Sequence, residues 1–316
     1  MIALMTKKVN IFAHEPESCY NINNSLAALR SFCALKIRKL PVWAFIILES
    51  VLYISFLYTD ITCHYTAGVW LKYASVTLCA LFALFVSLRN LSAFVKSSRS
   101  NASQKADFSY KPGLCIFIAA ALVFTLLADT FLLLFELNLP GLISFCAVQS
   151  LYLWVILSIA SSVKSSKSEP LKSFFAAITI RVVLAFIIYI TAAAPVMGKE
   201  LLSAVTCFYA VSFWGNILRL SRAVYSVRTL RHASASIPAP LSCPRPALLL
   251  AGLILFVLCD INVAFFNVSS YLDTSSPVLL FLIRASEYLM WAFYLPGQVL
   301  IALSCLKYDP EDSGTN

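Results

Sequence analysis

Two aspartates lie inside long apolar runs of the chain, and they are the residues best placed to do chemistry. Asp129 occurs in F-T-L-L-A-D-T-F-L-L-L-F and Asp260 in F-V-L-C-D-I-N-V-A-F-F. A medium of low dielectric disfavours two negative charges, so one acid stays protonated and donates a proton while the other accepts one. This pairing suits acid-assisted addition of water. The alternative is a structural role, in which each aspartate hydrogen-bonds its neighbours or pairs with Lys72 or Arg181.

Other familiar chemistries lack the residues they need. The three histidines, His14, His64 and His232, fall outside the apolar runs, which excludes a three-histidine zinc site within them. The chain contains no H-E-x-x-H, G-x-S-x-G or Gly-rich phosphate-binding motif. We therefore expect no metal and no cofactor. None of the ten cysteines forms C-x-x-C, and most lie in apolar runs, where a thiol behaves as a small hydrophobe.

The elements that hold the aspartates are predicted to cross a membrane. Of the 316 residues, 60% are hydrophobic and only 12% are charged, whereas soluble domains are about half apolar and a quarter charged. This composition excludes a soluble two-domain enzyme, a disordered chain and a collagen-like chain. A spanning helix needs about 20 mostly apolar residues. Eight runs meet this requirement: 41–59, 67–88, 112–135, 141–160, 171–191, 201–220, 246–267 and 279–305.

The basic residues lie predominantly on one side of these runs. Most of the 24 lysines and arginines fall in the N-terminal arm, in the loops after the second, fourth and sixth runs, and in the C-terminal tail. The loops on the other side hold only Lys199. Such asymmetry predicts that both termini are cytoplasmic. The net charge of +9 is then a topology signal, so we expect anionic lipids at the cytoplasmic face as partners and no nucleic acid.

The predicted fold is an all-α polytopic membrane protein, with a bundle of eight transmembrane helices in residues 41–305. Residues 1–40 form a basic cytoplasmic N-terminal arm, for which an interfacial helix and a solvated tail are equal alternatives. The arm lacks the pattern of a removable signal peptide. Residues 306–316 form a polar C-terminal tail. A bacterial plasma membrane and an internal eukaryotic membrane both fit this multi-pass architecture.

The two aspartates occupy matching positions in the predicted bundle. Each lies about two turns from the outer end of an outward-running span, and these spans are the third and the seventh. Gln149 and Gln298 in the fourth and eighth spans match loosely. One interpretation is two tandem four-helix halves in the same orientation, and the other is eight unrelated helices. Two further acids within the spans, Glu49 and Glu287, have no assigned role.

At these residues the chain resembles the YhhN family of lysoplasmalogenase-like integral membrane proteins. The resemblance covers about residues 41–305, and Lys72 and Tyr209 fit it. Its ordered motifs are Ala128-Asp129, then Gly141, Phe145, Gln149 and Tyr152, then G-L-I-L-F-V-L-C-D ending at Asp260, then Tyr294 and Gln298 in Y-L-P-G-Q-V-L-I-A. Three positions depart from the family, with Ala128 for Gly, Cys259 for Ser and Gln149 for His. Glutamine hydrogen-bonds but does not shuttle a proton as histidine does.

The resemblance implies hydrolysis of the vinyl ether bond of lysoplasmalogens, which are ether lysophospholipids. The products would be a fatty aldehyde and a glycerophospho-ethanolamine or -choline. Asp129 and Asp260 would be catalytic, and Lys72 would hold the phosphate unless it forms a Lys–Asp pair. Water or the glycerol would be oriented by four residues that interhelical hydrogen bonding explains equally well: Gln149, Tyr152, Tyr294 and Gln298. Tyr209 and Asn216 are interpreted as packing and helix-contact residues rather than catalytic ones.

Two rival functions stand beside this one. The first is a membrane lipid-binding or transport protein without catalysis, in which the aspartates relay protons or hold a headgroup. The second is an inert scaffold. A catalytic pair requires carboxyl groups within roughly 10 Å of each other, by analogy with other two-carboxylate hydrolases.

Overall fold

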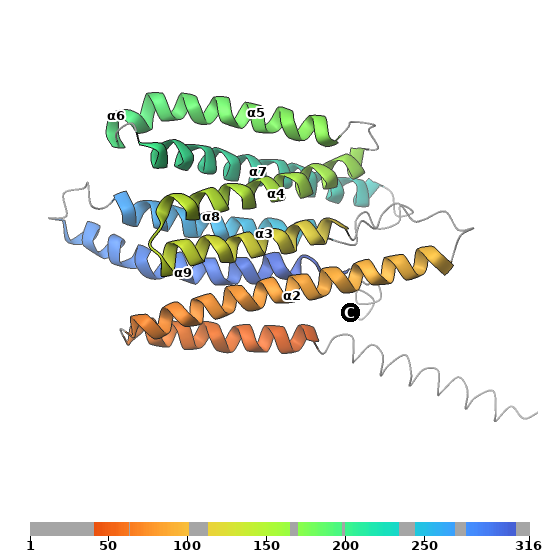
Figure 1. Ribbon diagram of the computed structural model, residues 1–316, viewed down its shortest axis with the longest axis horizontal. Coiled ribbons are helices and arrows are strands. Elements are labelled where there is room, and N and C mark those ends of the chain that lie inside the picture. The colour runs from red at the N-terminus through yellow and green to blue at the C-terminus, as the bar shows by residue number, and fades with distance from the viewer. Residues whose placement is uncertain are drawn as a thin grey trace, which may run out of the picture. The chain divides into compact units, whose positions relative to one another are not determined.

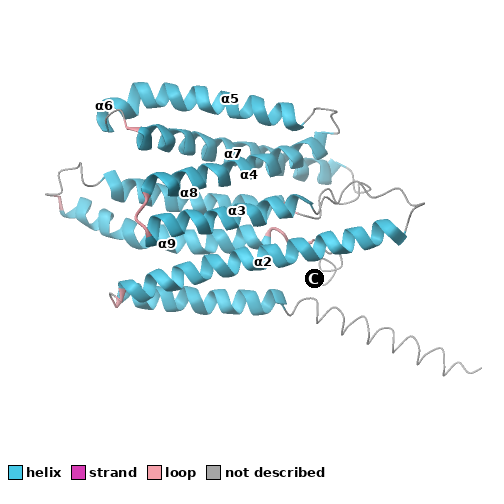
Figure 2. Ribbon diagram, in the orientation of Figure 1, coloured by secondary structure: helices cyan, strands magenta, loops and turns pink. Residues whose placement is uncertain are grey.

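The computed structural model describes residues 41–62, 64–100, 113–164, 170–197, 200–233, 244–268 and 276–307. These residues are almost entirely helical and include no strand (Figure 2). Eight helices are long and apolar enough to cross a membrane, which confirms the predicted all-α bundle of eight spans for this part of the chain. The predicted N-terminal arm and most of the C-terminal tail lie outside the described residues. The chain from Glu49 onward forms one compact unit, to which the packing below refers.

The helices follow the predicted spans in order. The first helix is Pro41–Ile61. It is followed by α2 (Tyr65–Ser100), α3 (Gly113–Asp129), α4 (Asn138–Lys164), α5 (Pro170–Ile188), α6 (Ala194–Met197), α7 (Leu201–Ala233), α8 (Pro246–Val268) and α9 (Pro277–Leu303). Two π-helical turns, η1 (Thr130–Leu134) and η2 (Tyr189–Ala193), extend α3 and α5. A proline begins α5, α8 and α9, where its missing N–H has no partner to lose.

Two helices run well beyond their predicted spans. The predicted spans 67–88 and 201–220 end at basic residues, whereas α2 has 36 residues and α7 has 33. A positive charge ends a membrane span, but arginine and lysine are good helix formers. Neither extension contains a glycine or a proline, so nothing in the local sequence stops the helix.

Neighbouring helices in the unit pack as follows (Figure 1). α3 packs on α4, and α8 packs on α9. α4 also packs on α7, and α2 packs on both α3 and α9. α5 lies beside α7 at the margin of the bundle and contacts α4. The third and seventh spans, which carry the aspartates, are therefore each held by partners from several other spans.

Helices α8 and α9 approach each other closely at two glycines. A Cβ atom placed on Gly252 would lie 2.9 Å from the carbonyl oxygen of Gly297 and 2.7 Å from Cγ1 of Ile301. Small residues at such crossings let helix backbones approach, which increases van der Waals contact between membrane helices. The two glycines therefore set the spacing between α8, which carries Asp260, and α9, which carries Tyr294.

The backbone changes its helical register directly after Asp129. This residue ends α3, and the next five residues form the π-helical turn η1. Glu136 then adopts a left-handed conformation with φ of 53°, and the N–H of Leu137 donates to the carbonyl of Phe131 at 2.8 Å. Wide π turns occur mostly as single turns inside α-helices and are frequent at functional sites. The turn lets the chain reverse into α4 within a few residues of Asp129.

Candidate functional site

Asp129 is buried and is hydrogen-bonded to a tyrosine from a distant part of the chain. Its carboxyl Oδ2 accepts a hydrogen bond of 2.6 Å from the hydroxyl of Tyr294 in α9. The side chains of both residues are buried, with only 4% and 3% of their surfaces exposed. A hydrogen bond closed off from water in this way satisfies both polar groups without a counter-ion.

Asp260 forms the second pair of the same kind. Its Oδ2 accepts a hydrogen bond of 2.7 Å from the hydroxyl of Tyr209 in α7, and the carboxyl group is partly buried. Tyr209, interpreted from the sequence as a packing and helix-contact residue, thus contacts the aspartate of a neighbouring helix through its hydroxyl group. Neither aspartate pairs with Lys72 or Arg181 among the described residues, since those cations contact other groups.

One aromatic cluster joins the two aspartate–tyrosine pairs. The ring of Phe256 lies with its centroid 5.4 Å from that of Tyr294, and one turn further along α8 comes Asp260. Phe145 bridges Phe256 and Tyr209, at centroid distances of 5.8 and 5.9 Å. Edge-to-face and tilted ring contacts of this kind stabilise aromatic pairs beyond their burial alone. Both carboxyl groups therefore border one aromatic cluster built from α4, α7, α8 and α9.

Two buried polar side chains without partners lie one turn from the first pair. Gln298 follows Tyr294 by one turn of α9 and is fully buried, and neither its amide nitrogen nor its amide oxygen has a hydrogen-bond partner among the described residues. Thr125 precedes Asp129 by one turn of α3, and its hydroxyl group is also without a partner there. Buried polar groups are normally satisfied, so these atoms are candidates for contacts with water or substrate.

The ammonium group of Lys72 is a buried positive charge near the Asp129–Tyr294 pair. Its ammonium group lies 3.5 Å from Oδ1 of Asp60, which makes the Lys–Asp pair that the sequence left open as the alternative to phosphate binding. It also lies over the rings of Phe56 and Trp291, at 4.7 and 4.2 Å from their centroids. The ring of Trp291 packs at 5.5 Å against Tyr294, so one aromatic ring separates Lys72 from the Asp129 pair.

The two remaining predicted site residues, Gln149 and Tyr152, have no hydrogen bond to either aspartate among the described residues. Gln149 accepts hydrogen bonds from Asn216 at its backbone and side-chain oxygens, at 2.8 and 2.9 Å. Tyr152 is fully buried, and its hydroxyl group has no partner among the described residues. The structure gives neither residue a contact with an aspartate.

The two unassigned acids also have defined places. Glu49 is buried and accepts hydrogen bonds from Ser75 at 2.6 Å and from Cys79 at 3.3 Å, whereas Glu287 is exposed on α9. Glu49 is thus a third buried carboxyl group, outside the aromatic cluster. None of the six described cysteines forms a disulfide.

Asp60 and Thr125 are the site neighbours that the sequence analysis missed. Asp60 follows the predicted span 41–59 by one residue, while the helix continues to Ile61. A polar residue at i−4 from Asp129 was the available signal for Thr125, since residues four apart share a helix face.

The described part of the chain contains no group of three or more His, Cys, Asp or Glu side chains placed to hold a metal ion. Comparisons of the whole chain with models of protein families, with curated proteins and with solved structures gave no match.

Proposed function

We propose that this chain is a multi-pass membrane hydrolase that cleaves the vinyl ether bond of lysoplasmalogen-type lysophospholipids. The family resemblance supplies the reaction, and one observation from the structure supports it. Two carboxyl groups, that of the buried Asp129 and that of the partly buried Asp260, border the same aromatic cluster, and each accepts a hydrogen bond from a tyrosine hydroxyl group. Paired carboxyl groups in apolar surroundings are the arrangement that acid-assisted hydration of an enol ether needs.

Each carboxyl group retains one oxygen for chemistry. The tyrosines donate to Oδ2 of each aspartate, and Oδ1 accepts no hydrogen bond among the described residues. In the proposed reaction, Oδ1 of the protonated aspartate gives its proton to the vinyl carbon, which leaves an oxocarbenium ion. The second carboxylate takes a proton from water as the water oxygen adds to that ion, and this gives a hemiacetal.

Collapse of the hemiacetal restores both acids. The hemiacetal hydroxyl group returns its proton to the first aspartate, and the second aspartate protonates the departing glycerol oxygen. The products are a fatty aldehyde and a glycerophospho-alcohol, with no proton gained or lost by the protein. Lys72 would leave its ion pair with Asp60 and bind the substrate phosphate. Gln298 would orient the attacking water.

The proposed topology puts both termini in the cytoplasm, as the basic residues predict. It places the aspartates toward the opposite face, since Asp129 lies five residues from the end of its span at Leu134 and Asp260 seven residues from Asn267. The proposal includes two tandem four-helix halves, and the packing supports them. α3 packs on α4 as α8 packs on α9, α2 packs on α3 as α7 packs on α8, and α4 packs on α7 as α9 packs on α2.

One observation favours the second candidate, a lipid-binding protein that cleaves no bond. Two pockets lie along α4 and α7, and neither of them is lined by an aspartate. In that case the aspartate–tyrosine pairs would be structural contacts between helices, and lipid would occupy the pockets.

The deciding experiment measures aldehyde release by the purified full chain in nanodiscs supplied with a lysoplasmalogen. Asp129→Asn and Asp260→Asn should each lower the rate by at least about 100-fold, as loss of a general acid or base does. Glu49→Gln is the matched control, because it neutralises a buried carboxyl group outside the aromatic cluster, and its rate should stay within about twofold. Full activity in both aspartate variants would refute the two-carboxylate mechanism. If the unmodified chain released no aldehyde, the proposal that the chain is a hydrolase would be refuted.

A further inference from the structure

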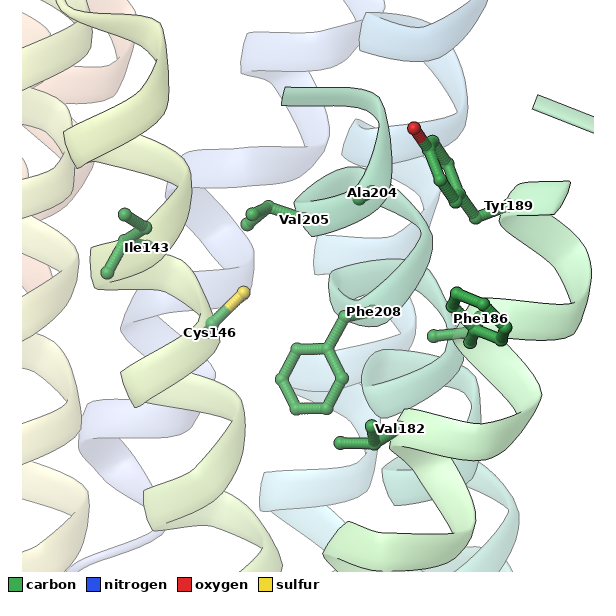
Figure 3. A pocket seen from close by; sticks show the side chains of 9 residues that line it. Ile143, Cys146, Val182, Phe186, Tyr189, Ala204, Val205 and Phe208 are labelled. Atoms are coloured by element: carbon green, nitrogen blue, oxygen red, sulfur yellow. The ribbon is translucent and has the colours of Figure 1, made fainter. Parts of the chain in front are cut away.

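An apolar pocket opens among α4, α5 and α7, and neither aspartate lines it. Its volume is about 340 Å³. This volume is near the lower end of the range of roughly 300–1,000 Å³ for small-molecule pockets. Its walls are mostly aliphatic and aromatic, with the thiol of Cys146 and the ring of Tyr189 among them, and they include Val182, Phe186 and Phe208 (Figure 3).

Polar side chains from three helices form a hydrogen-bonded group next to this pocket. Arg181 directly precedes Val182 on α5, and its Nη2 donates a hydrogen bond of 2.7 Å to the side-chain oxygen of Asn216 on α7. Asn216 in turn donates to Gln149, which follows Cys146 by one turn of α4. Gly215 lets the guanidinium approach α7 closely, since a Cβ atom there would lie 3.2 Å from Nη2.

Three buried donors at this level are left without partners among the described residues. They are Nη1 of Arg181, Nε2 of Gln149 and the hydroxyl group of Ser212, which follows Phe208 by one turn of α7. Their side chains are only 4%, 0% and 1% exposed. Each atom can give a hydrogen to an acceptor, and they come from the three helices that form the pocket. The set therefore matches a ligand group that accepts several hydrogen bonds.

The charge balance indicates that this ligand group is an anion. The sequences of α4, α5 and α7 contain no aspartate or glutamate. Arg181 makes no ion pair within the described part of the chain, and Arg219, one turn beyond Gly215, is a like charge. A buried guanidinium keeps its proton, and an uncompensated charge inside a membrane protein is strongly unfavourable.

We propose that α4, α5 and α7 form a binding site for a long-chain fatty acid, with its carboxylate on Arg181, Gln149 and Ser212 and its hydrocarbon chain in the apolar pocket. A carboxylate accepts the two parallel N–H groups of arginine and further donors at once. Arg181 lies near the middle of its span, Pro170–Ala193, so a small anionic headgroup suits this depth better than a zwitterionic phosphate headgroup. The site is independent of the aspartates and of the hydrolase proposal.

The test measures binding of radiolabelled oleate to the purified full chain in nanodiscs. Oleate should bind saturably, and Arg181→Gln should weaken its affinity by about tenfold or more, as expected on loss of a charge-assisted bidentate contact. Arg228→Gln is the matched control, because it removes the same charge from an exposed position of α7 that lines neither pocket, and it should change affinity less than about twofold. Oleyl alcohol, which has the same chain without the carboxylate, should not compete.

A second variant protects the test against misfolding. Val205→Trp fills the pocket while leaving the polar group intact, and it should abolish oleate binding in protein that remains monodisperse. The proposal is wrong if Arg181→Gln binds oleate as tightly as the unmodified chain, or if oleyl alcohol competes equally. It is also wrong if inorganic phosphate or a lysophosphatidic acid displaces oleate more effectively than unlabelled oleate does, or if Val205→Trp keeps full affinity.

Discussion

Substitution of Gly252 by alanine tests the close packing that links the two halves of the candidate site. Alanine would ordinarily stabilise a helix interior by about 0.8–1.0 kcal/mol relative to glycine. Here its methyl group would lie 2.7 to 3.0 Å from Ile301 and from the Gly297 carbonyl, whereas carbon atoms pack best at about 3.5–4.0 Å. Two of these three contacts are with backbone atoms of α9, so no side-chain rotation relieves them. Overpacking of this kind typically costs about 1–3 kcal/mol, which exceeds the gain in helix propensity.

We therefore expect Gly252→Ala to lower the unfolding midpoint by several degrees, at about 2–4 °C for each kcal/mol. A thiol-reactive fluorescent dye measures this midpoint directly, because five of the six described cysteines are buried and react when the bundle opens. Gly113→Ala is the matched control, since a Cβ atom there meets nothing within 4 Å. Separation of α8 from α9 should also widen the contact of Phe256 with Tyr294 and lower aldehyde release. An unchanged or higher midpoint for Gly252→Ala would refute the packing argument.

Three further predictions follow from single contacts. Tyr294→Phe keeps the ring packing and removes only the hydroxyl donor to Asp129, so aldehyde release should fall by about tenfold while the unfolding midpoint drops by only a few degrees. Tyr209→Phe should act in the same way through Asp260, and equal rates for both variants and the unmodified chain would contradict a role for the tyrosines. Glu136→Gly relieves a left-handed backbone conformation and should raise the stability measured by the same dye assay by up to about 1 kcal/mol, whereas Glu136→Val should lower it.

The number and order of the spans could be predicted from the sequence because each apolar run is long enough to cross a membrane and is bounded by polar residues. The bounds of α2 and α7 could not, since the signal that ends a span is a charge and the signal that ends a helix is a glycine, a proline or a cap. The π turn after Asp129 was also beyond prediction, because the run T-F-L-L-L has no residue that marks a change of helical register.

The sequence also predicted only part of the candidate site, namely the two aspartates but not the residues that contact them. Burial makes each intramembrane acid conspicuous in a sequence, so Asp129 and Asp260 could be found directly. Their partners could not, because Tyr294 and Tyr209 lie 165 and 51 residues away along the chain, and helix periodicity carries no information about which helices meet. Gln149 illustrates the same limit, because its sequence position left substrate orientation and interhelical hydrogen bonding as equal alternatives, and only the packing shows that it accepts a hydrogen bond from Asn216.

The buried and partly buried ionisable residues divide by the kind of partner they have, and the division bears on function. Lys72 forms an ion pair with Asp60, so the two charges cancel. Asp129, Asp260 and Glu49 have neutral hydroxyl or thiol donors instead, and such a donor tolerates a carboxyl group that gains or loses a proton. An arginine partner would hold a carboxylate permanently ionised and would make proton transfer costly. Tyrosine partners therefore suit acids that change protonation during a reaction. Among the described residues Arg181 has only the side-chain amide of Asn216 as a partner, and because it does not readily lose its proton, an anion bound from outside the chain would compensate its charge.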